Sequence, residues 1–369
     1  MKTKAAVVYE VGKPIEIEEL DLDGPQAGEV LIRYTHAGLC HSDVHIAHGD
    51  LEARLPMVLG HEGAGIIEDV GPGVTRVQAG DHVVCSFIPN CGTCRWCSTG
   101  QQAICDMGAT ILEGYLPGEH FPFSGPQGQY GAMCMLGTFS QYSVIHQNSV
   151  IKVDDDLPLD KAVLVGCGVP TGWGAAVNAA DVRPGETVIV AGVGGIGINA
   201  VQGARIAGAR KIIAVDPVPF KLEQAKAFGA THTFSSLEEA IAGVGELTLG
   251  QMCDSVICTY SVMRSDLLEP ALTLTAKGGN CVVTSVAPIA QGQVDLNLFM
   301  LAMMNKQISG SIYGSESPRT AIPKLLNLYR DGILKLDELI TKTYTLDEVN
   351  QGYADLEDGK ILRGALTFS

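Results

Sequence analysis

The first part of the chain alternates between apolar and polar residues with the period of two that is typical of half-buried β-strands. This pattern predicts strands at 5–8, 15–18, 29–34, 63–71, 81–84 and 139–144. Gly24-Pro25 marks a turn between the second and third of these segments. Short strands separated by turns predict a small β-rich domain.

From about residue 165, apolar runs alternate with helical segments. The runs predict strands at 186–191, 211–215, 255–258, 281–284 and 308–313. Helical patterns lie at 173–180, 197–207, 220–228 and 266–274. Continuous apolar strands are typical of a parallel sheet that is covered on both faces. The alternation therefore predicts an α/β fold with a doubly wound parallel sheet.

The last part of the chain carries predicted helices at 322–330 and 346–357 and a predicted strand at 364–368. We expect this tail to fold back on the β-rich domain. That domain would then be discontinuous, with residues 1–166 and 313–369 on either side of an α/β domain at 167–312. Residues 108–140 are rich in glycine and aromatic residues and are interpreted as a long loop. Such a loop either lines a substrate channel or packs on its own aromatic side chains.

Length and charge narrow the class of protein. The 369 residues include 46% hydrophobic and 18% charged residues, which allows two domains with sizeable cores. No apolar run reaches the roughly 18 residues of a membrane span, and Glu10 interrupts the first run, which is too short for a secretory signal. The net charge of −16 argues against nucleic acid and anionic membranes as partners. We expect a cytoplasmic protein that acts on a small molecule.

Four of the eleven cysteines lie close together, at Cys91, Cys94, Cys97 and Cys105. In a cytoplasmic enzyme such a cluster indicates a metal site rather than a disulfide framework. Four thiolates close tetrahedrally on one zinc ion and leave no open position, which makes a structural site. An iron–sulfur cluster also uses four thiolates, but no proline follows the last cysteine and there is no second run, so zinc is favoured.

A second candidate metal set begins at Cys40 and continues at His61. Cysteine and neutral histidine are zinc ligands, and a catalytic site keeps one coordination position open. Ser42 and His45 follow Cys40 closely and form a candidate path for a proton. The alternative is that Cys40 is a buried core thiol and the histidines lie at the surface.

A glycine-rich run directly follows the predicted strand at 186–191 and opens a helix. Its residues are Gly192, Val193, Gly194, Gly195, Ile196 and Gly197, and Asp216 ends the next strand. In this context the run predicts a dinucleotide site: Gly192 allows a tight turn, Gly194 lets the pyrophosphate approach, and Gly197 lets the helix pack on the strand. The N-terminus of the helix offers its N–H groups to the phosphates.

Asp216 predicts NAD rather than NADP. Its carboxylate can accept hydrogen bonds from ribose hydroxyls and would repel a 2′-phosphate. Residues 217–220 include no arginine that would hold such a phosphate. Lys221 lies nearby, where it either contacts a ribose or is an exposed charge on a helix.

These motifs occur in one order along nearly the whole chain, and in that order the chain resembles the zinc-containing medium-chain alcohol dehydrogenases. The segment Gly60-His61-Glu62-Gly63-Ala64-Gly65 is similar to the family's signature around its zinc histidine. The resemblance implies a GroES-like catalytic domain and a Rossmann domain with the active site in the cleft between them. It also implies a homodimer or homotetramer, for which the apolar segment at 298–304 is either an interface or core.

The resemblance implies two zinc ions per chain and a set of site residues. Cys40, His61 and Cys167 would hold the catalytic zinc, and Ser42 and His45 would relay a proton through the cofactor ribose. The other implied positions are Glu62 near the metal, Asp43 orienting His61, Thr171 near the nicotinamide, and Arg363 near the pyrophosphate. His41 stands where many members have an arginine, which should weaken the clamp on the pyrophosphate or make it pH-sensitive. Phe87 is expected to line the substrate pocket, or else to be plain core packing.

The implied reaction is hydride transfer between an alcohol and C4 of a nicotinamide. Residues 111–135 look most like the nitrosoaniline-dependent alcohol dehydrogenases of actinobacteria, in which the nicotinamide stays bound and is re-oxidised in place. The segment around His41, with Asp50 and Glu52 nearby, is also similar to thiol-adduct formaldehyde dehydrogenases, which usually lack the relay histidine that His45 supplies. A third reading is a catalytically silent NAD- or zinc-binding relative, which would not need Ser42 and His45 beside an open metal site.

Overall fold

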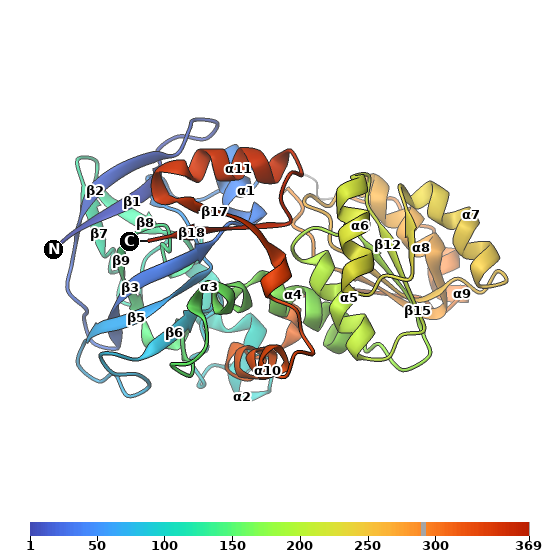
Figure 1. Ribbon diagram of the computed structural model, residues 1–369, viewed down its shortest axis with the longest axis horizontal. Helices are drawn as coiled ribbons and strands as arrows, with labels where there is room; N and C mark the ends of the chain where they lie inside the picture. Colours follow the sequence, from blue (N-terminus) through green and yellow to red (C-terminus); the bar gives the residue numbers. More distant parts are fainter. Residues whose placement is uncertain (289–292, 369) are drawn as a thin grey trace. The chain divides into compact units, whose positions relative to one another are not determined.

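The computed structural model describes residues 1–288 and 293–368 and divides the chain into two compact units (Figure 1). The first unit contains Met1–Cys167 and Ser317–Ser369, and the second contains Gly168–Glu316. These divisions differ by one residue (167 against 166) and by four residues (316 against 312) from the predicted ones. The second difference arises because Gly314 packs tightly in the second unit: a Cβ on Gly174 would lie 2.3 Å from its carbonyl oxygen.

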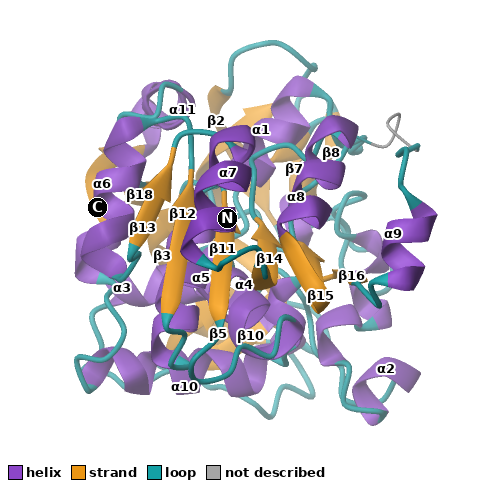
Figure 2. Cartoon of the chain, turned by 90° about the vertical axis from the view of Figure 1, so that its right-hand side faces the viewer, coloured by secondary structure: helices purple, strands orange, loops and turns teal. Residues whose placement is uncertain are grey.

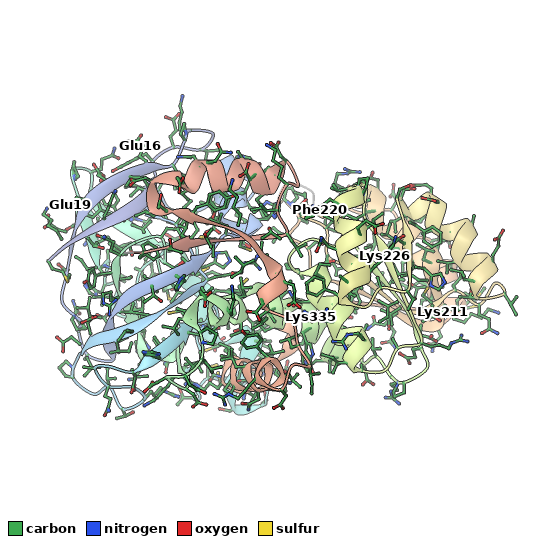
Figure 3. The ribbon with its side chains drawn as sticks, viewed as in Figure 1. Glu16, Glu19, Lys211, Phe220, Lys226 and Lys335 are labelled. Carbon is green, nitrogen blue, oxygen red and sulfur yellow. The ribbon has the colours of Figure 1, made fainter. Side chains whose placement is uncertain are left out.

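Two β-sheets build the first unit. The barrel contains β1 (Lys2–Val8), β2 (Glu16–Leu22), β7 (Phe123–Gly125), β8 (Gly128–Ala132) and β4 (Met57–Val58) in that order. The other sheet has the order β10 (Val150–Lys152), β6 (His82–Cys85), β5 (Gly63–Val70), β3 (Glu29–Gly38), β18 (Arg363–Thr367), β17 (Ile340–Thr345), with β9 (Tyr142–His146) also on β3. The alternation predicted at 15–18 is present only at its start: Ile15 is buried and Glu16 is exposed (Figure 3), whereas Ile17 and Glu18 are both half-buried.

The C-terminal tail returns to the first unit and completes its sheet. Strand β18 pairs antiparallel with β3, so that Ala365 faces Gly38. Helix α11 (Val349–Glu357) is fixed to the start of the chain because Asn350 exchanges two hydrogen bonds with the backbone of Ile15, at 3.0 and 2.8 Å. In Figure 1 this red segment lies among the blue strands of the N-terminal part.

The interpretation of residues 108–140 as one long loop is wrong in part, because β7 and β8 lie within it and complete the barrel. Phe123, Tyr130 and Phe139 are fully buried rather than packed at the surface. The two strands contain three and five residues. Strands this short, with glycines inside and beside them, give almost no alternation to detect.

The second unit is a parallel sheet of six strands (Figure 2). Their order is β13 (His232–Phe234), β12 (Lys211–Val215), β11 (Thr187–Ala191), β14 (Cys253–Cys258), β15 (Thr275–Val283), β16 (Gln307–Gly310). Counted from β11, this is the order 3-2-1-4-5-6 of the doubly wound dinucleotide-binding fold. The predicted doubly wound class is therefore confirmed. We did not predict β13, nor the amphipathic helix α7 (Leu237–Leu247) that follows it.

The other helices are α1 (His41–His48), α2 (Arg95–Ser98), α3 (Leu159–Ala162), α4 (Gly168–Gly174), α5 (Gly197–Ile206), α6 (Pro219–Phe228), α8 (Leu268–Leu274), α9 (Leu298–Met303) and α10 (Pro318–Arg330). Helix α6 presents both Phe220 and Lys226 to solvent (Figure 3). Helix α9 exposes Leu298 and Phe299, each 68% accessible, so the segment at 298–304 is not part of the core of this chain.

Within 1–288 and 293–368, no single helix is long and apolar enough to cross a membrane. A bent pair of helical segments, 159–166 and 168–179, meets the length and composition criteria only when the two are taken together.

Candidate active site

Four buried side chains with metal-binding atoms meet in the first unit. Cys40 lies two residues after the end of β3, at the N-cap position of α1. His61 and Glu62 precede β5, and Cys167 follows a 3₁₀ turn. Their ligand atoms all lie within 4.8 Å of one another. Three separate segments of the chain therefore bring the predicted ligands together with Glu62.

Asp43 orients the ring of His61. One oxygen of its carboxylate, Oδ1, lies 3.3 Å from Nδ1 of His61 and also accepts a hydrogen bond of 3.0 Å from the N–H of Gly60. The other ring nitrogen, Nε2, is buried and has no hydrogen-bond partner among the described residues. Because buried polar atoms are normally paired, a bare nitrogen beside two thiols is what an imidazole that ligates a metal would leave.

Burial and close contact shift the pKa values of the ionisable side chains in this cluster. A hydrogen bond from Cys167, helped by His61 and Arg363, holds the pKa of Cys40 well below its usual range. Burial raises the pKa of Glu62 to about 7, although the Arg363 guanidinium opposes this shift. Burial also disfavours a charged His61, but Asp43 and Cys40 outweigh it and raise the pKa of that ring. A divalent cation would satisfy both the thiolates and the bare ring nitrogen, so the donor set fits zinc.

The Glu62 carboxylate forms a buried ion pair with the Arg363 guanidinium, which donates from Nη2 to Oε2. The pairing of β18 with β3 brings Arg363 from the end of the chain to this position. Gly38 leaves room for the Glu62 carboxylate, because a Cβ on Gly38 would lie 2.0 Å from Oε2 of Glu62. A contact between Arg363 and a cofactor phosphate stays a prediction.

The candidate relay lies on α1. Oγ of Ser42 is 3.7 Å from Sγ of Cys40. The ring of His45 is buried, and its Nδ1 lies 2.9 Å from Oδ2 of Asp50. We had not assigned Asp50 to this histidine. The only signal in the sequence is the His-x-x-x-Gly-Asp spacing, which becomes informative once a helix is known to end at Gly49. His41, at the first position of α1, is half-buried, and its contact with a phosphate stays a prediction.

Phe87 lies next to the metal set. Its ring packs edge-on against that of His61, with 5.9 Å between the centroids. This position is suited to a wall of a substrate pocket, and a contact with substrate stays a prediction.

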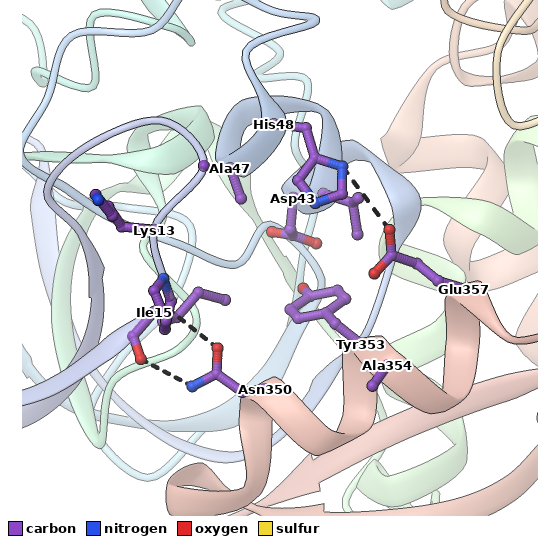
Figure 4. A pocket seen from close by; sticks show the side chains of 12 residues that line it. Lys13, Ile15, Asp43, Ala47, His48, Asn350, Tyr353, Ala354 and Glu357 are labelled. Atoms are coloured by element: carbon purple, nitrogen blue, oxygen red, sulfur yellow. Dashed lines mark hydrogen bonds and ion pairs between the residues drawn. The ribbon is translucent and has the colours of Figure 1, made fainter.

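Asp43 also lines a cavity of about 480 Å³, together with Tyr353 of α11 (Figure 4). At the rim, His48 and Glu357 face one another at 3.8 Å, and Asn350 holds Ile15. Burial and then the nearby Asp43 raise the pKa of Tyr353. We did not predict this residue, because its contact with Asp43 spans most of the chain and leaves no local pattern.

All four residues of the second candidate metal set come from one short segment of the chain. The ligand atoms of Cys91, Cys94, Cys97 and Cys105 also lie within 4.8 Å of one another. None of the eleven cysteines forms a disulfide. Backbone N–H groups point at the sulfur atoms: Cys94 N lies 3.3 Å from Sγ of Cys91, and Cys97 N lies 3.4 Å from Sγ of Cys94.

These N–H groups favour thiolates. Burial alone would raise the pKa of Cys91, but hydrogen bonds from Thr93 and Cys94 bring it down to about 6. Burial raises the pKa of Cys105 to about 12. Four thiols that cannot all ionise without a counter-charge, and whose sulfur atoms lie within 4.8 Å of one another, fit a zinc ion with no open position.

The glycine-rich run of the second unit forms the turn between β11 and α5. Gly192 has a φ of 89°, and a Cβ on Gly197 would lie 1.9 Å from the carbonyl oxygen of Gly192. In front of Gly194 there is open space, with no atom within 4 Å of a Cβ built there. The hydroxyl of Thr259, which we had not predicted, donates to the carbonyl of Gly192 and holds the turn. The turn therefore has the close packing and the open face that a dinucleotide phosphate needs.

Asp216 is buried beside this turn. Its two oxygens accept hydrogen bonds from the N–H groups of Val193, at 3.0 Å, and Val218, at 2.9 Å. A carboxylate has about four acceptor sites, so it can still accept from a ribose. Thr171 is buried on α4, and Lys221 is half-buried on α6. Their contacts with a cofactor stay predictions.

A doubly wound dinucleotide sheet, together with a β-rich unit that carries a buried Cys-His-Cys set, defines a zinc-binding dehydrogenase. Comparison with known proteins gives the family. Residues 26–155 match the alcohol dehydrogenase GroES-like domain, and residues 195–330 match the zinc-binding dehydrogenase domain.

The relatives agree with this assignment over the full length. The chain is 58% identical over 369 residues to the NDMA-dependent alcohol dehydrogenase of Amycolatopsis methanolica, with 100% of both chains covered. It is 37% identical over 380 residues to the S-(hydroxymethyl)glutathione dehydrogenase of Paracoccus denitrificans, again with 100% of both covered. The crystal structure of the benzyl alcohol dehydrogenase of Acinetobacter calcoaceticus aligns with a TM-score of 0.93 at 31% identity, covering 100% of both chains.

The chain therefore belongs to the zinc-binding alcohol dehydrogenase family, as the resemblance implied, and it is an alcohol/aldehyde oxidoreductase. The predicted GroES-like and Rossmann fold classes are confirmed, and so is the likeness to the nitrosoaniline-dependent subgroup.

Alanine substitutions at two glycines of the same turn should distinguish an effect on cofactor binding from an effect on folding. Gly194→Ala should leave the melting temperature near that of the wild type and lower the affinity for the dinucleotide at least tenfold, because the methyl group enters the open face of the turn. Gly197→Ala should destabilise the protein by about 1–3 kcal/mol, because its methyl group meets backbone. Thermal unfolding measures the stability, and titration with NAD after removal of any bound cofactor measures the affinity. Equal loss of stability in both variants would contradict this assignment.

Asp43→Asn should loosen the catalytic metal while the fold stays intact. The amide removes the negative charge that orients His61, and the loss of such a partner typically costs 10–100-fold in metal affinity. Release of zinc to a chelator, followed by a colorimetric dye, measures this change. Asp69→Asn, at an exposed position, is the matched control. Release at the wild-type rate would mean that Asp43 does not support the metal.

Proposed function

We propose that this protein oxidises an alcohol to its aldehyde, and catalyses the reverse reaction, with NAD and two zinc ions per chain. The observation that carries the proposal is the buried set of Cys40, His61 and Cys167, in which Nε2 of His61 has no hydrogen-bond partner in the described part of the chain. Zinc held by these residues supplies a Lewis acid for the substrate oxygen, and a bound nicotinamide supplies the hydride acceptor. The cysteines of the 91–105 segment hold the structural zinc.

The chain's own residues bind and move the proton. The Ser42 hydroxyl, beside Cys40, is placed to take the hydroxyl proton of the substrate. His45, one turn further along α1, is the general base that accepts this proton and removes it from the reacting centre. Phe87, packed edge-on against the His61 ring, would form one wall of the substrate pocket, and Asp43 keeps the His61 ring in its ligating orientation.

Asp216 supports NAD as the cofactor. It is buried at the end of β12, where a 2′-phosphate would meet a negative charge. In this environment the repulsion is poorly screened, so the site should exclude NADP.

We further propose that the nicotinamide stays bound and is re-oxidised in place by an external acceptor. The 58% identity to an NDMA-dependent alcohol dehydrogenase supports this reading. The thiol-adduct formaldehyde dehydrogenase ranks second, because the identity to a relative of that kind is 37% and because His45 is present. The exposed apolar face of α9, with Leu298, Phe299 and Met303, lies next to the edge strand β16 and supports a homodimer or homotetramer.

Protein purified without added cofactor tests the proposal directly. We expect two zinc ions per chain by elemental analysis and an absorbance in the NADH band that appears with an alcohol and disappears with a nitrosoaniline acceptor. Turnover only with added free NAD would be consistent with the proposed dehydrogenase activity but would reject the proposal that the cofactor is retained. One zinc ion or none would reject the assigned ligands.

The proposed proton relay predicts a pH-dependent loss of activity when its residues are replaced. His45→Gln should slow alcohol oxidation about 10²-fold below about pH 7, and less at high pH, where hydroxide can accept the proton instead. Ser42→Ala should lose activity while it retains its zinc. Steady-state rates across pH, with zinc content as the control, measure both effects. Equal activity of His45→Gln at every pH would remove His45 from the mechanism.

A further inference from the structure

We infer that Asp50 is a positioning residue for the reaction: it holds His45 in the tautomer whose Nε2 accepts the proton. This inference rests on the relay proposed above for Ser42 and His45. It adds a residue whose place is set by the end of α1 and not by the metal site.

The contact is specific in its atoms. Nδ1 of His45 lies 2.9 Å from Oδ2 of Asp50. The His45 side chain is 4% exposed, whereas that of Asp50 is 34% exposed. An ionised carboxylate can only accept hydrogen bonds, so Nδ1 must carry the hydrogen. In a neutral imidazole the other nitrogen, Nε2, is then the base.

The backbone builds this contact. Helix α1 ends at His48, and Gly49 follows in the left-handed conformation with a φ of 84°. The N–H of Gly49 binds the carbonyl of Ile46 at 3.2 Å, and the N–H of Leu51 binds the carbonyl of His45 at 3.1 Å. The chain turns back on the helix, so the side chain of Asp50 reaches a ring five residues earlier.

A purely structural role explains this arrangement poorly. A carboxylate just beyond the C-terminus of a helix faces the negative end of the helix dipole, which is unfavourable. An ion pair with one partner partly in solvent typically contributes about 0–1 kcal/mol. Fixing a tautomer is a different kind of gain. In serine proteases a carboxylate at Nδ1 does this for the catalytic histidine, and its amide variant is slow because the wrong tautomer forms.

The first unit uses the same device at a second histidine. Asp43 contacts Nδ1 of His61, which leaves Nε2 toward the metal set. Asp50 contacts Nδ1 of His45 in the same manner. The two carboxylates lie seven positions apart in the sequence (50 − 43), one in α1 and one just after it. One helix and its C-terminal turn would therefore set the tautomers of both functional imidazoles.

The test compares Asp50→Asn with Glu52→Gln, which removes the same charge from an exposed side chain two residues away. The assay uses the primary alcohol that the wild type turns over fastest. At neutral pH, kcat of Asp50→Asn should fall about 10–100-fold with KM changed less than about twofold. Glu52→Gln should match the wild type, and Asp50→Glu should recover most of the rate. Zinc content and melting temperature check that each variant is folded.

Nuclear magnetic resonance supplies a readout that does not depend on turnover. In protein labelled with ¹⁵N-histidine, the His45 signals are assigned by their loss in His45→Gln. We expect the Nδ1–H tautomer in the wild type and a shift toward the Nε2–H tautomer in Asp50→Asn. The same tautomer in both proteins would overturn the inference, and so would a kcat of Asp50→Asn equal to that of Glu52→Gln.

The double variant separates the two proposals. If His45→Gln is slow, adding Asp50→Asn should cause no further loss, because Asp50 acts only through His45; an additional loss would overturn the inference. If His45→Gln is slow and Asp50→Asn is fast, the relay stands and the role of Asp50 is wrong. If His45→Gln is itself fast, the relay is wrong and the role of Asp50 falls with it.

Discussion

The need to balance buried charge at the metal set is the constraint on which the first unit depends. Glu62 is fully buried, and its counter-ion is Arg363, which arrives from the last strand of the chain. A buried ion pair is costly to break, because one charge is then left uncompensated. The pairing of β18 with β3 brings in the guanidinium, and β3 ends at Gly38, two residues before Cys40. The return of the chain to the first unit therefore supplies the counter-ion of a buried acid at the site.

Much of the fold could be read from the sequence because its signals are local. The apolar run of β11, the glycine turn after it and Asp216 at the end of β12 lie within one βαβ segment. Helix α7 also has a local signal that we did not use. Ser236 caps it, and Leu237, Ala240 and Val244 repeat with helical spacing and are buried. The barrel strands β7 and β8 were missed for a physical reason, because segments this short take their conformation from their partners.

The site residues also fall into two groups, those with a local signal in the sequence and those without one. The four cysteines of the 91–105 segment are close in the sequence, and their spacing alone indicates a metal site. The set around His61 needed the family resemblance, because Cys167 lies more than 100 residues further along the chain. Tyr353 beside Asp43, Thr259 on the Gly192 carbonyl and Arg363 on Glu62 are each brought in from far along the chain. A period or a motif carries no information about such contacts. The family resemblance supplied both Arg363 and Glu62, but their ion pair became visible only in the folded sheet.

Of the two covalent links between the units, one begins at a candidate metal ligand and the other is hydrogen-bonded, through Asn90, to a second candidate metal set. One link leaves the first unit at Cys167, and the other re-enters it at Ser317, whose hydroxyl accepts a hydrogen bond of 2.8 Å from Asn90. Asn90 in turn accepts a hydrogen bond from Sγ of Cys97. The backbone at Ser317 therefore depends, through Asn90, on the order of the four-cysteine segment, although the two lie more than 200 positions apart in the sequence.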